Sequence, residues 1–292
     1  MNHAAVMKSS NAFGSELKRW RASRGKSQLE LSMIAGYSQR HVSFLESGRS
    51  RPSRTTVITL AEALDVPVRE RNSLLKAAGF APVYGHEPLD SAALNPALSA
   101  LETVVASHRP FPAIIVDRGW NVLAGNDNAF ALFQRFLDAP LAFDPASPLN
   151  AMRACIDPLG MRPYIVGWDT FAAALLVSMR HELAFEGDNA DLRALIEMIE
   201  ADPEFRARNR DANSGQVAPV ATLSLERDGF RVDLFSLLST FATANDATLS
   251  DLRVETFFPA NEVSRAALSS LDEALRGRPS ASPDAGAWRR TG

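Results

Sequence analysis

The sequence is short of features that several classes of protein require. Its 292 residues contain one cysteine, Cys155, which excludes an intrachain disulfide and a multi-cysteine metal site. The longest strongly apolar stretches, 171–179 and 235–238, fall far short of the roughly 20 residues that cross a bilayer. Residues 1–11 are polar and lack the apolar stretch of an export signal. We therefore expect a cytoplasmic protein with no membrane-spanning segment.

Motifs that carry catalysis are missing as well. The sequence has no G-x-S-x-G, no phosphate-binding glycine loop and no H-E-x-x-H, and its five histidines are scattered without metal-ligand spacing. His181-Glu182 is typical of an exposed pair on a helix. We expect no enzymatic activity, no metal and no cofactor other than a bound apolar molecule. An unrecognised enzyme would need ionisable groups that converge in a pocket.

The charge of −3 hides an uneven distribution. Residues 13–80 hold twelve Lys or Arg against six Asp or Glu, a net +6, whereas residues 81–292 hold eighteen against twenty-eight, a net −10. The basic end is suited to a polyanion, and the acidic remainder would be repelled by phosphates. This asymmetry favours a nucleic-acid-binding region joined to a separate body.

The basic region begins with the pattern of two helices. Phe13, Leu17 and Trp20 recur at the spacing of one buried helix stripe. Ser27 and Glu30 form the pattern of a capping box, which predicts a second helix from there to residue 35.

A sharp turn and a third helix follow. Gly36 supplies a residue that adopts a left-handed backbone at little cost, and Ser38 can cap a helix over 39–47. Two short helices joined by a turn with glycine are typical of a helix-turn-helix. Thr55 or Thr56 is the predicted cap of a fourth helix, and a fifth helix closes near residue 79.

This stretch resembles the XRE (Cro/C1-type) repressor family. The residues that carry the resemblance are Ser27-Gln28, Leu31, Ala35-Gly36-Tyr37-Ser38, Val42, Leu45-Glu46-Ser47-Gly48 and Pro52. The resemblance implies an all-α, five-helix, lambda-repressor-like domain whose third helix enters the major groove of double-stranded DNA.

The resemblance also places the DNA contacts. It implies that Gln28 meets a phosphate and that four residues of the third helix face bases, namely Gln39, Arg40, Ser43 and Phe44. Gln can pair with adenine, Arg with guanine, and an aromatic edge can contact a thymine methyl. The following loop would supply phosphate or minor-groove contacts from Arg49, Arg51 and Arg54. Two alternatives stay open: an interaction bundle with a solvated basic face, and a Phe44 that packs inward.

Residues 95–275 mix short strands with helices. Helices are predicted at 94–105, 126–137, 163–185, 192–200 and 203–210, and strands at 113–116, 120–124, 220–226, 230–238 and 252–258. Asp228-Gly229 is a strong signal for a tight hairpin between two of these strands. The pattern predicts an α+β domain in which helices cover a five-stranded antiparallel sheet, in a PAS-like order of elements.

The second region resembles the ligand-binding domain of MmyB-like XRE regulators. The residues that carry the resemblance are Pro112-Ala113, Val122-Leu123-Ala124-Gly125-Asn126, Asp157-Pro158, Gly167-Trp168-Asp169, Glu204-Phe205-Arg206 and Pro219. The resemblance implies a PAS-like fold that binds a fatty-acid-like or other hydrophobic molecule. The chain departs from the family at Gly125, where an aromatic residue is usual, at Leu149, where Arg is expected, and at Ala218, where His is expected.

Large apolar side chains of this region could line a ligand cavity. We predict a lining of Trp120, Phe130, Phe133, Trp168, Phe171, Leu175 and Met179, because ligand pockets are mostly apolar with few polar anchors. The alternative for each of these residues is ordinary core packing.

Together these patterns predict a multidomain, sequence-specific transcription regulator. The expected order is a disordered tail (1–11), the DNA-binding domain (12–80), a linker (81–94), the ligand-binding domain (95–275) and a second disordered tail (276–292). A homodimer would bind paired DNA sites, and a small hydrophobic effector would change the placement of its recognition helices. The alternative is a second domain that serves as a protein-interaction or dimerisation module, which predicts a large exposed apolar patch.

Overall fold

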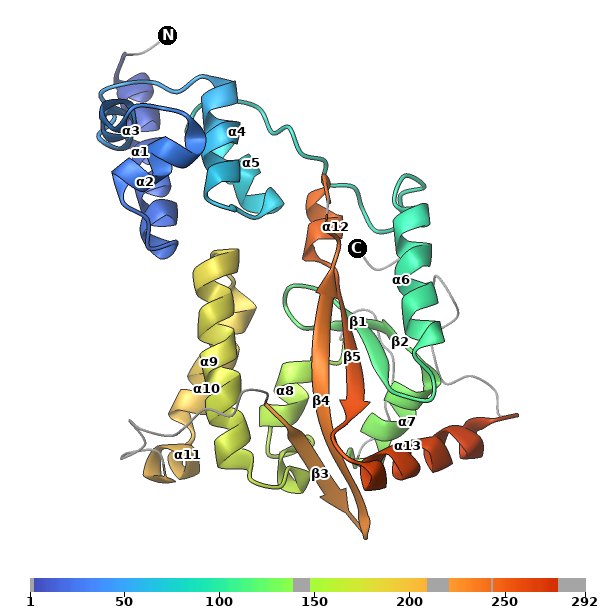
Figure 1. Ribbon diagram of the computed structural model, residues 1–292. Helices are drawn as coiled ribbons and strands as arrows, with labels where there is room; N and C mark the ends of the chain where they lie inside the picture. Colours follow the sequence, from blue (N-terminus) through green and yellow to red (C-terminus); the bar gives the residue numbers. More distant parts are fainter. Residues whose placement is uncertain (1–2, 139–147, 209–220, 243, 278–292) are drawn as a thin grey trace. The chain divides into compact units, whose positions relative to one another are not determined.

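The computed structural model describes residues 3–138, 148–208, 221–242 and 244–277 (Figure 1). The chain divides into two compact units, the first built on the chain up to His86 with short segments at Glu182–Asp188 and Thr243–Ser250, the second on the rest. Within the described ranges, no helix has the length and apolar character needed to cross a membrane. The predicted C-terminal tail from residue 278 onward, and the positions Ala218 and Pro219, lie outside the described residues.

Five helices form the first unit: α1 (His3–Ser23), α2 (Gln28–Ala35), α3 (Gln39–Glu46), α4 (Arg54–Ala63) and α5 (Val68–Ala77). The predicted helical region is confirmed. The helix α1 begins at His3, earlier than the predicted domain start at residue 12. Alanine and methionine occur in that stretch without Gly or Pro before Gly14, so local propensity supports helix there.

Local hydrogen bonds set the helix-turn-helix. The Ser27 hydroxyl accepts from the Glu30 amide at 3.1 Å, and the Glu30 carboxylate accepts from the Ser27 amide at 2.7 Å, which confirms the capping box. These bonds lower the pKa of Glu30. Gly36 ends α2 at φ 72°, in the left-handed region, and the Ser38 hydroxyl caps α3. The turn therefore follows from residues within four positions of it.

The cap of α4 differs from the prediction. Ser53 is the N-cap residue, and its hydroxyl accepts from the Thr56 amide at 3.0 Å. The predicted caps, Thr55 and Thr56, lie inside the helix, and the Thr56 side chain is buried against the Ser53 hydroxyl. A serine with a threonine three residues later offered two capping registers, and packing of Val57 decides between them.

One apolar cluster joins the five helices. It is made of Phe13, Leu17, Trp20, Leu31, Val42, Leu45, Val57, Leu60, Ala61, Leu64, Val66, Leu74 and Leu75. Residues of α3 occupy it at Val42 and Leu45, so the opposite face of that helix points outward.

The second unit contains a sheet with helices before, between and after its strands. The strands are β1 (Ala113–Val116), β2 (Val122–Gly125), β3 (Leu223–Arg227), β4 (Phe230–Thr240) and β5 (Arg253–Pro259). They are antiparallel in the order β2-β1-β5-β4-β3. The helices are α6 (Asn95–Ser107), α7 (Asp127–Arg135), α8 (Ala151–Ile156), α9 (Trp168–Glu186), α10 (Ala190–Ala201), α11 (Pro203–Arg208) and α13 (Glu262–Leu275). The last residues of α9 and nearly all of α12 (Ala247–Asp251) are grouped with the first unit. The predicted α+β domain with a five-stranded antiparallel sheet is confirmed.

The long helix is shorter at its start than predicted. Instead of beginning at Pro163 it begins at Trp168, after a 3-10 turn at Arg162–Tyr164. Gly167 has φ 70°, a left-handed conformation that ends any continuous helix, and Ile165 forms a β-bridge with Leu225 of β3. Pairing with the sheet therefore overrides the helical periodicity of 163–167.

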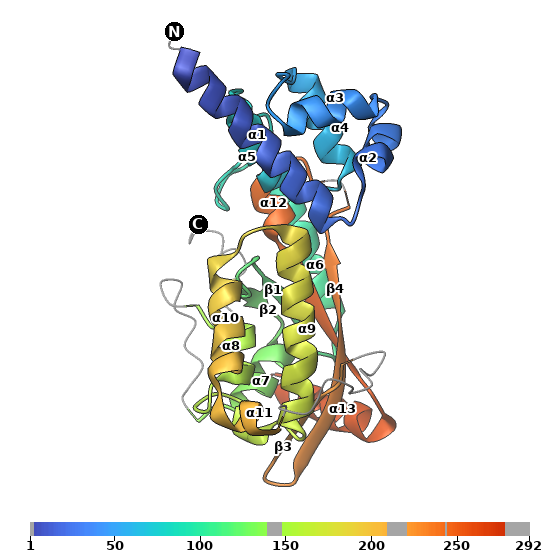
Figure 2. The same cartoon turned by 90° about the vertical axis from the view of Figure 1, so that its left-hand side faces the viewer.

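Helices cover the sheet on both faces. Figures 1 and 2 show α8, α9 and α10 on one side of it and α6 on the other. Successive residues of a strand point to opposite faces, and this alternation places Phe257 of β5 on the side of α7, edge-on to Phe133. Phe258 points to the other side, where it meets His108 after α6. We call the face that carries Phe257 the inner face.

Candidate nucleic-acid interface and ligand site

The exposed face of α3 carries the predicted base-reading residues. Gln39 and Arg40 are exposed, and Ser43 and Phe44 are half-buried, whereas Val42 and Leu45 of the same helix are fully buried. Polar side chains with hydrogen-bonding ends thus lie together on one surface. An α-helix with such a surface fits the width of the DNA major groove.

Two arginines contact the Phe44 ring. The guanidinium carbon of Arg40 is 5.1 Å from the Phe44 ring centroid, and that of Arg49 is 5.9 Å from it. The Phe44 carbonyl also accepts the Arg49 amide at 2.8 Å, which ties the loop after α3 to the helix. The Phe44 ring therefore holds two cationic side chains near α3 through cation–π contacts.

Glu46, at the end of α3, joins three helices. Its carboxylate accepts two hydrogen bonds from the Arg21 guanidinium of α1, at 2.6 and 2.9 Å, and one from the Gln28 amide of α2 at 2.8 Å. The Glu46 side chain is 4% exposed. The hydrogen bonds to Glu46 raise the pKa of Arg21. Gln28 is predicted to meet a phosphate. One of its two side-chain amide hydrogens is already donated to Glu46, a bond that links α2 to α3.

Two further predicted residues lie beside this surface. Arg51 is exposed in the loop after α3. Arg54 is the first residue of α4 and not part of the loop, and its guanidinium carbon lies 5.8 Å from the Phe80 ring centroid. The cationic side chains at positions 40, 49, 51 and 54 therefore come from the helix, the loop and the start of the next helix.

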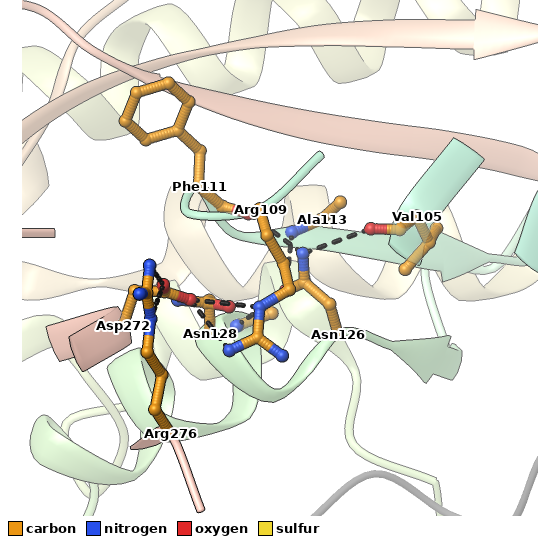
Figure 3. A network of polar contacts seen from close by, with 9 residues as sticks. Val105, Arg109, Phe111, Ala113, Asn126, Asn128, Asp272 and Arg276 are labelled. Atoms are coloured by element: carbon orange, nitrogen blue, oxygen red, sulfur yellow. Dashed lines mark hydrogen bonds and ion pairs between the residues drawn. The ribbon is translucent and has the colours of Figure 1, made fainter. Parts of the chain in front are cut away.

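A network of polar contacts fixes α7 on the sheet of the second unit (Figure 3). The Asn126 side chain caps α7 by accepting from the Ala129 amide at 2.9 Å. It also accepts from the Ala113 amide of β1 and donates to the carbonyls of Val105 and Phe111. This one asparagine therefore links the end of α6, the start of β1 and the start of α7.

A second part of the network joins α7 to α13. The Asp272 carboxylate accepts from Asn128 at 3.1 Å and from Arg109 at 3.0 Å, and Arg276 lies 3.4 Å from it. Burial alone would raise the pKa of Asp272, but these hydrogen bonds and the arginine charges outweigh burial and lower it. The network holds α7, whose aromatic residues face the inner face of the sheet.

Three predicted ligand residues converge on the inner face. The Phe130 ring packs against Gly125. A Cβ atom added at Gly125 would lie 3.3 Å from that ring. Phe133 meets Phe257 with ring centroids 6.1 Å apart. The Trp120 ring lies 5.6 Å from the guanidinium carbon of Arg253 on β5. All three predicted side chains are buried.

Trp168 has a defined set of partners of its own. Its indole N–H donates to the Cys155 carbonyl of α8 at 3.1 Å, and the Phe205 ring meets it edge-on. The Arg162 guanidinium lies 3.8 Å above the indole and pairs with Asp202 at 2.6 Å. The indole thus fastens α8, α9 and α11 together, and its one polar group is already hydrogen-bonded.

The remaining predicted lining residues lie along α9. Leu175 and Met179 are buried, and Phe171 is half-buried. In the described residues, no group of three or more His, Cys, Asp or Glu side chains is arranged to hold a metal ion.

Comparison with known proteins agrees with both units. The sequence profile of the "MmyB-like transcription regulator ligand binding domain" matches residues 98–271, more than half of the chain. This chain belongs to the MmyB-like transcription regulators. A helix-turn-helix profile matches residues 17–71 of the regulator. Over 53 residues the regulator is 42% identical to the "Uncharacterized HTH-type transcriptional regulator y4dJ" of Sinorhizobium fredii, covering 18% of this chain and 69% of the relative.

Two residues of the regulator were missed by reasoning from the sequence. In the sequence, Glu46 appears only as one of the residues that carry the family resemblance. A single glutamate in a short helix does not reveal that its partners lie on two other helices. Glu255 lies on the inner face beside Phe257, yet its alternation with Val254 and Thr256 resembles an ordinary half-exposed strand. In both cases the decisive contacts come from distant parts of the chain.

Proposed function

We propose that the regulator binds duplex DNA in a sequence-dependent way through α3. Gln39 and Arg40 are the base-reading residues, with Ser43 and Phe44 beside them and Arg49, Arg51 and Arg54 on the backbone. The observation that carries this proposal is the outward polar surface of α3, held in place from behind by Glu46. A carboxylate that fastens α1 and α2 to the end of α3 gives that surface a defined orientation.

Replacing a base-reading residue should lower sequence preference, whereas replacing a residue that contacts the DNA backbone should lower overall affinity. Gln39→Ala and Arg40→Ala should each reduce preference for the selected DNA site by about 1 to 3 kcal/mol, the discrimination of one good side chain–base pair. Arg51→Ala should weaken binding to all sequences about equally and flatten the salt dependence. Selection of binding sites from a random library, followed by anisotropy titrations at several salt concentrations, separates the two classes. Unchanged preferences in both base-reader variants would contradict the assignment of α3.

We further propose that two copies of the chain act on a paired site. One short helix reads only a few base pairs, and two recognition helices about 34 Å apart would read half-sites one helical turn apart. Analytical ultracentrifugation with and without the selected DNA tests this. Two chains per duplex with a two-fold symmetric site are expected, and a single chain on an asymmetric site would contradict it.

The second unit is proposed to bind a small hydrophobic effector that changes DNA affinity. The inner face supports this, because Trp120, just before β2, and the aromatic residues of α7 lie on it beneath a separate layer of helices. A PAS-like, fatty-acid-like mode of binding belongs to the same proposal. Native mass spectrometry of the freshly purified chain, and melting in the presence of apolar compounds, test it. A chain that is always empty and that no compound stabilises would instead favour a protein-interaction module.

A further inference from the structure

The strand β4 extends well beyond the strand β3 that pairs with one of its sides (Figure 1). Pairing with β3 reaches only as far as Leu223, which lies opposite Leu234. β4 continues to Thr240 and stays paired with β5 on its other side. Residues 236–240 are all exposed, whereas Leu234, beside β3, is buried. We call residues 236–240 the open edge of β4.

The main-chain groups of every second residue of the open edge point away from β5. The Asp233 carbonyl accepts from the Ala260 amide at 2.8 Å, and the Leu237 carbonyl accepts from the Thr256 hydroxyl of β5 at 3.3 Å. Along an antiparallel strand, consecutive residues direct their N–H and C=O groups alternately to the two sides. The residues whose groups therefore point to the side where β3 has ended are Ser236, Leu238 and Thr240.

The composition of the open edge does not protect it from pairing. Natural edges are usually protected by charged side chains, by proline or by bulges. Residues 234–242 contain no charged residue, proline or glycine, and the register of β4 with β5 is continuous from 234 to 240. Leu237 is 55% exposed and Leu238 is 46% exposed, and their side chains point to opposite faces of the sheet. The edge thus offers hydrogen-bonding groups between two apolar surfaces, which another extended, uncharged strand would complement.

Charge and symmetry favour a second copy of this chain as the source of that strand. Residues 81–292 carry a net charge of −10, so two copies repel each other where their charged surfaces meet. An uncharged segment laid antiparallel on its own copy brings no like charges together. Pairing of the same segment from both copies also creates a two-fold axis, which is the symmetry that a paired DNA site requires.

We propose that the open edge of β4 pairs with the open edge of a second copy and joins the two sheets across a two-fold axis. With Leu238 opposite Leu238 of the second copy, Ser236 lies opposite Thr240, and about six main-chain hydrogen bonds form. β4 ends at Thr240 and the chain turns at residue 242, so the second copy leaves the edge before it reaches Leu223 of β3. This inference rests on the proposed action of two copies and names the surface that joins them.

Exchanging the charge at Leu238 tests the pairing in the full-length chain. Sedimentation velocity without DNA should show a dimer of the wild type. Leu238→Lys and Leu238→Glu each place two like charges opposite each other, and each should weaken dimerisation at least about tenfold. An equimolar mixture of the two variants should restore the dimer, because opposite charges then meet, whereas mixing cannot repair a misfolded chain. Leu159→Lys, at a position of the second unit that is 90% exposed, is the matched control and should leave dimerisation unchanged.

Hydrogen exchange of the wild type gives a second measurement that needs no variant. The amides at positions 236, 238 and 240 should exchange more slowly as the protein concentration rises through the range in which the dimer forms, because they become hydrogen-bonded. Exchange at these positions that does not depend on concentration would contradict the pairing.

The outcomes separate this inference from the function on which it rests. A wild type that stays monomeric, a dimer that survives both variants, or a mixture that fails to restore the dimer would each overturn the pairing of the open edges. If the chain is monomeric in solution yet two copies bind each selected duplex, the inference fails and the proposed paired site stands. If a dimer forms through the open edge but only one chain contacts each duplex, the paired site fails and the inference stands.

Discussion

Replacing Gly14 by alanine tests how the recognition helix is held. Gly14 lies inside α1 where that helix crosses the end of α3. A Cβ at this position would lie 2.5 Å from the Glu46 carbonyl oxygen and 2.6 Å from that of Leu45. Both are backbone atoms, which cannot rotate away, so α1 and α3 would have to separate.

Two opposing effects determine the size of the change. An alanine in a helix interior stabilises by about 0.5 to 1 kcal/mol relative to glycine. Forcing an extra carbon into a packed contact costs about 1 to 3 kcal/mol, and the higher end applies where backbone is involved. The net loss should be about 1 to 2 kcal/mol, which lowers the melting temperature of a domain of this size by roughly 4 to 8 °C for each kcal/mol. Displacement of α3 should also weaken DNA binding about tenfold.

Calorimetry of the full-length chain and anisotropy with the selected DNA give both quantities. Ser15→Ala is the matched control, since Ser15 is the exposed neighbour of Gly14 and the substitution has only a helix-propensity effect. If Gly14→Ala raised the melting temperature as Ser15→Ala should, with DNA affinity unchanged, the close approach of α1 to α3 would be refuted.

Three further changes address other parts of the molecule. Ser53→Ala removes the cap of α4 and should cost about 1 kcal/mol of the free energy of unfolding in urea titrations, and an unchanged value would exclude a role for the cap. Glu46→Ala leaves Arg21 half-buried without its carboxylate and should cost about 3 to 5 kcal/mol of the free energy of unfolding, more than Gln28→Ala. Equal losses in the two variants would contradict the role of Glu46 in joining α1, α2 and α3. The Glu255 carboxyl, with a pKa raised from 4.5 to about 7, holds its proton in the folded chain after the unfolded chain has released it. The stability that this group contributes is therefore complete below pH 4.5 and is lost as pH rises through about 7, by about 1 to 3 kcal/mol. Urea titrations at pH 5 and pH 8 should show this loss in the wild type and not in Glu255→Gln.

Local signals account for the parts of the fold that were predicted well. The Ser27–Glu30 capping box, the Gly36 turn and the Asp228-Gly229 hairpin each depend on residues within a few positions of one another. Their hydrogen bonds and backbone angles form regardless of what packs elsewhere. The helical stripe of α1 and the alternation of β5 are likewise readable in one segment, and so the first helices and the five strands could be predicted.

Errors arose where two local solutions were nearly equal. Ser53 and the threonines after it offer alternative caps, and the stretch around Pro163 satisfies a helical stripe as well as a turn. Packing of Val57 and the bridge from Ile165 to the sheet choose between them. Both choices depend on residues that are distant along the chain.

What the sequence by itself determined is the presence of a helix-turn-helix, its outward polar positions and an α+β second unit, since each is written in short-range periodicity and capping. What the tertiary structure decided is how those parts become a site. Glu46 is an ordinary glutamate until α1 and α2 bring Arg21 and Gln28 to it. Glu255 is one polar residue in an alternating strand until the register sets it between Ile114 and Leu238. The hydration of a charge depends on its neighbours in space, and only the folded chain supplies them.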